Sequence, residues 1–179
     1  MILENNYKNT VAVTKKKERA ESIFVVMNCS SDKFAKAVER LMKAATQSTL
    51  NQKHGACLVY GEQILSIGVN KRFNIRLNDH VLPLTIHAEL DALSNIYPKK
   101  MKGLDVLVIR VNKAKQLLYS RPCNSCIDKL SQKGIRKAYY SDIDGNIVYE
   151  FVDNMPKLHD SAGTRMRQRM NSKKMSGCC

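Results

Sequence analysis

The sequence contains no long hydrophobic run. Its purely apolar stretches are short, such as Ile23 to Met27, and its first residues lack the apolar core of a signal peptide. Internal repeats and low-complexity linkers are absent as well. These absences argue against a membrane-spanning helix, a secreted protein and a repeat protein. We expect a soluble cytoplasmic protein whose 179 residues comprise one domain with a buried core, flanked by tails.

The sequence also lacks the paired cysteines of a disulfide framework. Of its six cysteines, only Cys123 and Cys126 form a Cys-x-x-Cys pair, and the others lie in apolar surroundings or at the end of a polar tail. We therefore expect no disulfide bonds, and we assign the Cys-x-x-Cys pair to a metal.

Two short segments supply the ligands that a catalytic zinc ion requires. His87-Ala88-Glu89 offers one imidazole, and Pro122-Cys123-Asn124-Ser125-Cys126 offers two thiolates. A catalytic zinc takes three such protein ligands and leaves the fourth tetrahedral position to water. Glu89 is near enough to reach that water but badly placed to be a fourth ligand. The sequence predicts one zinc per chain, held by His87, Cys123 and Cys126, with Glu89 as the proton shuttle.

Two other interpretations of the Cys-x-x-Cys pair stay open. A closed structural zinc site needs a fourth ligand, and the remaining histidines, His54, His80 and His159, stand in no ligand-like spacing with either segment. A redox-active cysteine pair leaves His87 and Glu89 without a role.

Each segment begins an expected helix. The first runs from Ile86 to Ile96, with apolar residues at helical spacing, and ends before Pro98. The second runs from Cys123 to Lys133 and stops at Gly134. The metal is expected between the two helix N-termini, whose partial positive charge favours thiolate over thiol.

The other expected elements are apolar strands and one amphipathic helix. They are a helix from Asp32 to Ser48, strands from Ala56 to Tyr60 and Gln63 to Val69, a loop from Lys71 to Thr85, and strands from Leu104 to Val111, Ala138 to Ser141 and Ile147 to Val152. The complete order is αββαβαββ. It predicts a three-layer α/β/α sandwich with a mixed five-stranded sheet. We expect an N-terminal extension over residues 1–30, the domain over 31–155 and a tail over 156–179.

The His-x-Glu and Pro-Cys-x-x-Cys segments resemble the signature of the cytidine and deoxycytidylate deaminase superfamily. The resemblance implies the same three-layer fold and the zinc-dependent hydrolysis of cytosine to uracil, with release of ammonia. It also implies two substrate contacts. Asn70, which ends Ile67-Gly68-Val69-Asn70, resembles the asparagine that contacts the sugar, and Ala88 resembles the small residue whose backbone holds the pyrimidine edge.

The link between the last two strands bears on the substrate. In deaminases of free nucleosides these strands form an antiparallel hairpin, whereas in tRNA, polynucleotide and deoxycytidylate deaminases a helix crosses between them. Only Asp142 to Asn146 separates them here, which is too short for a crossover. The chain therefore resembles the free-nucleoside branch, although Arg121 stands where that branch usually has serine.

We expect a small substrate: cytidine, deoxycytidine or a monophosphate such as dCMP. Arg72, Arg76 and Arg121 are candidates to neutralise a 5′-phosphate. A base deaminase acting on tRNA or single-stranded polynucleotide remains an alternative, as does a deaminase-fold structural or interaction protein. Hairpin-type nucleoside deaminases assemble as oligomers, so the resemblance also implies a homo-oligomer.

Acidic residues are scarce at the C-terminal end. Residues 156–179 carry six basic groups and one acidic group, in a chain of net charge +14, and few core-forming apolar residues. We expect a disordered basic tail. Its charge is open to three interpretations: a solubilising end, attraction to nucleic-acid phosphates, or, through Cys178-Cys179, a terminus that resembles a double-prenylation signal. Without lipidation no membrane partner is expected, and deleting residues 157–179 is expected to leave small-substrate turnover unchanged.

Overall fold

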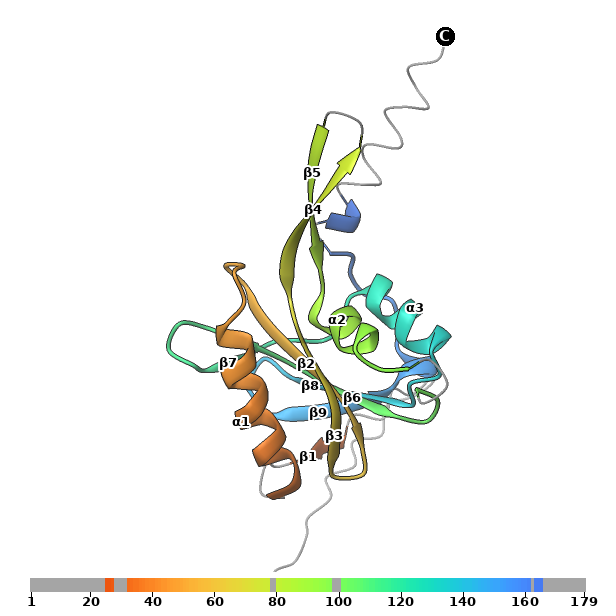
Figure 1. Ribbon diagram of the computed structural model, residues 1–179. Helices are drawn as coiled ribbons and strands as arrows, with labels where there is room; N and C mark the ends of the chain where they lie inside the picture. The colour runs from red at the N-terminus through yellow and green to blue at the C-terminus, as the bar shows by residue number, and fades with distance from the viewer. Residues whose placement is uncertain (1–24, 28–31, 78–79, 98–100, 162, 166–179) are drawn as a thin grey trace, which may run out of the picture.

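The computed structural model describes residues 25–27, 32–77, 80–97, 101–161 and 163–165 (Figure 1). In these ranges a mixed sheet lies between two helical layers. Helix α1 (Asp32–Thr46) covers one face of the sheet, and α2 (Ala88–Ser94) and α3 (Asn124–Gln132) cover the other. None of the helices in the described part of the chain is long and apolar enough to cross a membrane.

The main sheet is antiparallel except at one junction. Its order is β1 (Val25–Met27), β9 (Ile147–Phe151), β8 (Lys137–Ser141), β6 (Asp105–Val111), β2 (Lys53–Tyr60) and β3 (Gln63–Val69), and β7 (Leu117–Leu118) also pairs with β6. The parallel junction joins β6 to β8, and α3 lies in the crossover between them. The α/β sandwich with a mixed sheet is confirmed.

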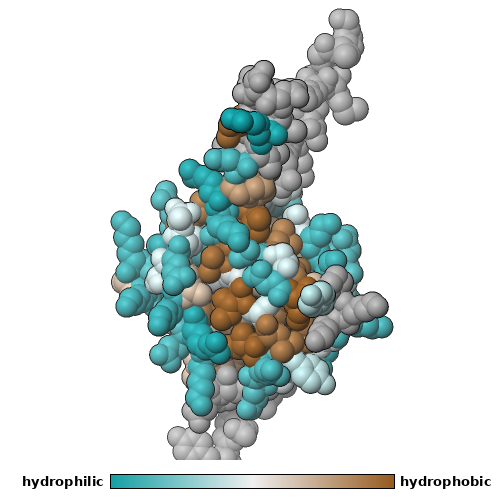
Figure 2. All heavy atoms as spheres, viewed as in Figure 1, coloured by the Kyte–Doolittle hydropathy of each residue, from teal (hydrophilic) through white to brown (hydrophobic). Residues whose placement is uncertain are grey.

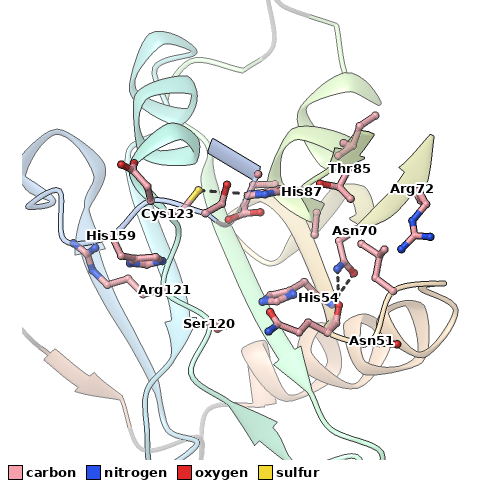
Figure 3. A pocket seen from close by; sticks show the side chains of 18 of the residues that line it. Asn51, His54, Asn70, Arg72, Thr85, His87, Ser120, Arg121, Cys123 and His159 are labelled. Carbon is pink, nitrogen blue, oxygen red and sulfur yellow. Dashed lines mark hydrogen bonds between the residues drawn. The ribbon is translucent and has the colours of Figure 1, made fainter. Parts of the chain in front are cut away.

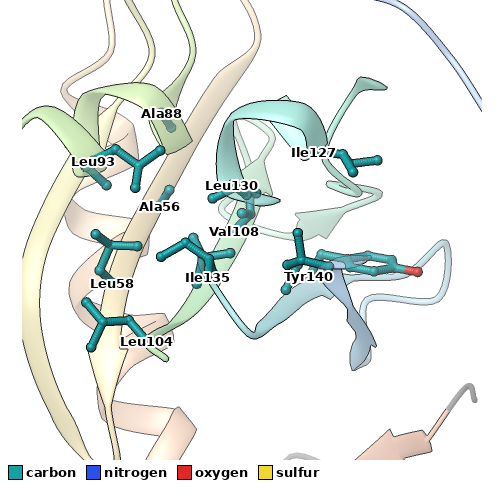
Figure 4. Packing of buried hydrophobic residues seen from close by; sticks show 14 of the residues in the cluster. Ala56, Leu58, Ala88, Leu93, Leu104, Val108, Ile127, Leu130, Ile135 and Tyr140 are labelled. Atoms are coloured by element: carbon teal, nitrogen blue, oxygen red, sulfur yellow. The ribbon is translucent and has the colours of Figure 1, made fainter. Parts of the chain in front are cut away.

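The two faces of the sheet carry separate apolar cores. Along β6, Val106 and Val108 belong to the core under α2 and α3, whereas Leu107 and Ile109 belong to the core under α1. Successive side chains of a strand point to opposite faces, so a strand covered on both sides needs apolar residues throughout. Figure 4 shows Val108 among side chains from both helices and from neighbouring strands.

Strands β8 and β9 form an antiparallel hairpin, as the short link between them predicts. The Asp142 side chain accepts hydrogen bonds from the backbone N–H groups of Asp144 and Asn146, at 2.9 and 2.8 Å. Gly145 adopts a φ of 84°, which favours glycine. Side-chain bonding and glycine together close the turn.

Residues 71–85, expected as a loop, form two strands instead. Strand β4 (Lys71–Leu77) pairs antiparallel with β5 (His80–Ile86), and the resulting ribbon extends away from the main sheet (Figure 1). Apolar and polar residues alternate along β4, but β5 contains the run Val81-Leu82-Pro83-Leu84, which breaks the alternation and includes a proline. Proline is tolerated here because a two-stranded sheet has only edge strands. The loop prediction is therefore wrong.

Two short strands were also not expected. Strand β1 lies within the segment assigned to an N-terminal extension and pairs with β9, and β7 adds to β6. The three residues of β1 and the two residues of β7 are too few to show an alternating pattern.

On the face seen in Figure 1, apolar side chains gather at the centre and hydrophilic ones surround them (Figure 2). Homo-oligomer formation stays a prediction, as do the domain boundaries.

Candidate active site

His87 and Cys123 occupy equivalent positions in two helices. Each is the N-cap, with an extended backbone: φ −76° and ψ 153° at His87, φ −74° and ψ 164° at Cys123. Cys126 follows in the first turn of α3 and is buried. The free N–H groups of a helix N-terminus carry partial positive charge, which stabilises thiolates placed there.

The three side chains form a group with the spacing of a metal site. His87 Nδ1 lies 3.2 Å from Cys126 Sγ and 3.6 Å from Cys123 Sγ, and all three ligand atoms lie within 4.8 Å of one another. Tetrahedral zinc bonded to nitrogen and sulfur places its ligand atoms about 3.5–3.8 Å apart. Donor types and spacing therefore fit zinc. In the described part of the chain, no other group of three histidine, cysteine or acidic side chains meets this criterion.

The two cysteines have opposite pKa shifts. Hydrogen bonding from Cys126, assisted by His87, lowers the pKa of Cys123 to about 4 against the effect of burial. The same hydrogen bond, together with burial, raises the pKa of Cys126 above its ordinary value. Cys123 is therefore a thiolate at neutral pH, and a metal would displace the remaining proton from Cys126.

Glu89 lies in the first turn of α2 beside the three candidate ligands. Its residue exposure is 5%, and burial raises the pKa of its carboxyl, while the neighbouring His87 opposes this shift. A raised pKa makes the proton-carrying form of the carboxyl more accessible, and a proton shuttle must adopt both the proton-carrying and the proton-free form.

A cavity of about 530 Å³ opens over this group (Figure 3). Its size falls in the range of pockets for small ligands. The lining comes from residues 49–52, His54, Asn70, Arg72, residues 85–89, Ser120, Arg121, Cys123, residues 159–161, Gly163 and Arg165.

Both expected substrate-contact residues lie at this cavity. Ala88 is buried next to His87. Asn70 is also buried, but its amide bonds to backbone: Oδ1 accepts from the His54 N–H at 2.8 Å, and Nδ2 donates to the Gln52 carbonyl at 2.5 Å. Asn70 therefore holds the loop between α1 and β2 in place. Substrate contact by Asn70 and Ala88 stays a prediction.

The three arginines suggested for phosphate binding lie in different surroundings. Arg72 is exposed at the cavity, and Arg76 is exposed on β4 outside its lining. The Arg121 side chain is only 2% exposed and pairs with Glu150, with Nε 2.8 Å from Oε1. Its Nη2 also donates to the Pro156 carbonyl at 2.8 Å. Arg121 is thus buried in a structural ion pair, but it also lines the cavity, and its Nη1 has no hydrogen-bond partner among the described residues. Phosphate binding by Arg121 stays a prediction.

His54 has no ligand-like spacing with the zinc segments in the sequence, yet it lines the cavity. Burial and then the charge of Arg110 lower its pKa to about 4, so its imidazole is neutral at physiological pH. Figure 3 shows its ring between Asn51 and His87. Nothing in the local sequence distinguishes it from an ordinary strand residue.

The expected disorder of the tail does not hold for its first residues. Segments 156–161 and 163–165 are ordered against the domain, and five of their residues line the cavity. Backbone and side-chain hydrogen bonds to Asn124 hold them there. The tail prediction is therefore wrong for this part, because the contacts join residues distant in sequence.

Fold and ligand group together define a zinc-dependent deaminase site. Residues 28–142 match the model of the cytidine and deoxycytidylate deaminase zinc-binding region. The chain belongs to this family.

A solved structure has the same fold. Cytidine deaminase from Burkholderia pseudomallei is 17% identical, with 70% of this chain and 98% of that chain covered and a TM-score of 0.50. The dCMP deaminase from cyanophage S-TIM5, in complex with dCMP and dUMP, is 23% identical, with 65% and 83% covered and a TM-score of 0.44. A comparison with curated proteins finds no match.

Proposed function

We propose that this protein deaminates the cytosine of a free nucleoside or nucleotide, namely cytidine, deoxycytidine or dCMP, and releases ammonia. The observation that carries the proposal is the position of Glu89. Its buried carboxyl lies beside His87, Cys123 and Cys126 at a cavity large enough for a nucleotide.

His87, Cys123 and Cys126 would hold the zinc. When bound, zinc acts as a Lewis acid that makes water nucleophilic at neutral pH. Glu89 accepts the two protons of the attacking water in turn, and it delivers one to N3 of cytosine and the other to the departing amino group. The oxygen of that water becomes the O4 atom of uracil, and the amino group leaves as ammonia.

Two features support a small substrate. The hairpin of β8 and β9 is the arrangement that the resemblance associates with free nucleosides. Residues 159–161, 163 and 165, which follow the last strand, also line one side of the cavity. A polynucleotide would need a path past this segment, so the basic charge alone does not favour it.

The test is ammonia release from cytidine, deoxycytidine, dCMP and single-stranded DNA, measured side by side at one salt concentration. We expect turnover of at least one free substrate and little with DNA. Glu89→Gln keeps the three ligands, so zinc content should be unchanged while kcat falls by about 10²–10⁴-fold. Turnover of DNA alone would refute the proposed substrate class, and a near-normal kcat in Glu89→Gln would refute the role of Glu89.

A further inference from the structure

The chain returns to the cavity after its last strand. Beyond β9 a short 3₁₀ helix (Val152–Asn154) leads to Met155, which is buried in the core under α2 and α3. The next carbonyl, that of Pro156, accepts the hydrogen bond from Arg121. The path of the following residues is therefore set by groups inside the domain.

Asn124 connects this path to the metal site. It is the first residue of α3 and follows the candidate ligand Cys123. Its backbone N–H donates to the His159 carbonyl at 2.9 Å, and its Oδ1 accepts from the His159 N–H at 3.1 Å. Its Nδ2 donates to Asp160 Oδ1 at 3.1 Å. One side chain and its own backbone N–H thus bond two successive residues of the C-terminal segment.

A second contact lies one turn further along α3. Lys157 Nζ pairs with the Asp128 carboxylate. Residues four apart in a helix share a face, so Asn124 and Asp128 present one continuous edge to the segment. This ion pair is exposed and contributes little by itself. Asn124 is the principal attachment.

The attached segment then forms part of the cavity lining. His159, Asp160 and Ser161 line it, as do Gly163 and Arg165. The Ser161 carbonyl accepts from the Arg165 N–H at 3.0 Å, which turns the chain back at this point. Figure 3 shows the His159 ring on the cavity side that carries Cys123 and Arg121.

We propose that residues 157–161 and 163–165 form a wall of the substrate pocket and that Asn124 is the positioning residue that holds it. The inference rests on the proposed function, because it takes the cavity over the metal group as the substrate site. It replaces the expectation that residues 157–179 are dispensable. Residues up to Arg165 contribute to substrate binding, whereas the deletion of residues 166–179 leaves it unchanged.

The experiment compares two truncations and two point variants of the zinc-loaded protein. Truncation after Pro156 removes the wall, and truncation after Arg165 retains it. Asn124→Ala removes the side-chain attachment. Ser125→Ala is the matched control, because Ser125 also lies between the two cysteines but makes no side-chain hydrogen bond within the described residues.

We expect truncation after Pro156 and Asn124→Ala to raise KM by about tenfold or more, the effect of losing one or two hydrogen bonds at a binding site, with a smaller change in kcat. Zinc content should stay at the wild-type level. Truncation after Arg165 and Ser125→Ala should retain the wild-type KM. In limited trypsin digestion, Asn124→Ala should be cut at Lys157 faster than Ser125→Ala.

Equal cleavage rates at Lys157 in the two point variants would overturn the role of Asn124. An unchanged KM in Asn124→Ala and in the truncation after Pro156 would overturn the wall. Where that truncation fails to fold, the full-length Asn124→Ala protein decides by KM. A wild-type protein that deaminates no cytosine substrate would instead refute the proposed function, while the cleavage comparison would still test the attachment.

Discussion

Gly68 allows β3 to pass directly under the helix that carries the site. A Cβ atom at this position would lie 2.2 Å from the backbone nitrogen of Ala92 and 2.4 Å from the carbonyl oxygen of Ala88. Both neighbours are backbone atoms, so no side-chain rotation relieves the overlap. Non-bonded heavy atoms are stable about 3.5 Å apart, so Gly68→Ala requires α2 or β3 to move by about 1 Å.

This movement would displace Glu89 and His87 relative to α3. A displacement of about 1 Å in a catalytic arrangement costs about 10²-fold in rate. Overpacking of this kind also costs about 1–3 kcal/mol in the free energy of unfolding. We therefore expect Gly68→Ala to fold with reduced stability, to bind zinc more weakly and to lose about 100-fold in kcat/KM.

Gly61→Ala separates the two effects. Gly61 has a φ of 58° and no heavy atom within 4 Å of an added Cβ, and it lies in the turn between β2 and β3. Alanine there costs about 1 kcal/mol through backbone strain, without pressing on α2. Denaturant unfolding and ammonia release, both with excess zinc, measure the two quantities. Retention of wild-type kcat/KM by Gly68→Ala, or an equal activity loss in Gly61→Ala, would refute this reasoning.

Two further predictions concern the metal and pH. Cys123→Ser should lower zinc content below one per chain, measured by atomic absorption after dialysis, because it removes a candidate ligand; full retention would contradict the assignment. The pKa of His54 is lowered from 6.5 to about 4, so the stability supplied by its neutral form is fully present above pH 6.5 and is lost as pH falls toward 4. Over that window the wild-type free energy of unfolding should fall by about 3 kcal/mol more than that of His54→Gln, measured by urea unfolding. Parallel pH profiles for the two proteins would contradict the shift.

The metal group was predictable because its information is local. Cys123 and Cys126, three residues apart at the start of a helix, share a face whatever the rest of the chain does. His87 and Glu89 likewise lie within one short segment. The main strands follow from alternating or continuous apolar residues. Sequence spacing therefore predicts which side chains meet, once two helix N-termini face each other.

The C-terminal wall was not predictable, because its attachment is polar and distant in sequence. His159 lies 35 residues from Asn124, and the bonds between them use an amide side chain and backbone groups. The segment contributes no apolar pattern, and its basic composition predicts disorder. The ribbon of β4 and β5 was missed for a related reason. The alternation is regular along β4 but not along β5, where Pro83 is also normally evidence against a strand.

The turn between β3 and β4 shows how polar side chains shape this pocket. Asp91, buried on α2, accepts from the Val69 N–H at 3.0 Å and pairs with Lys71 Nζ at 2.7 Å, so the turn is tied to the helix that carries Glu89. Asn70 lies between Val69 and Lys71. Its side chain bonds to the chain between α1 and β2, whose residues 49–52 line the cavity, and to the start of β2. A buried polar group left unpaired costs about 1–3 kcal/mol, so these bonds define the pocket as firmly as the apolar core does. A primary amide has two N–H donors and two acceptor lone pairs, which leaves Asn70 one of each after its bonds to the loop. Asn70 can therefore hold this loop and still bond to a sugar hydroxyl, so its structural role and its expected substrate contact are compatible.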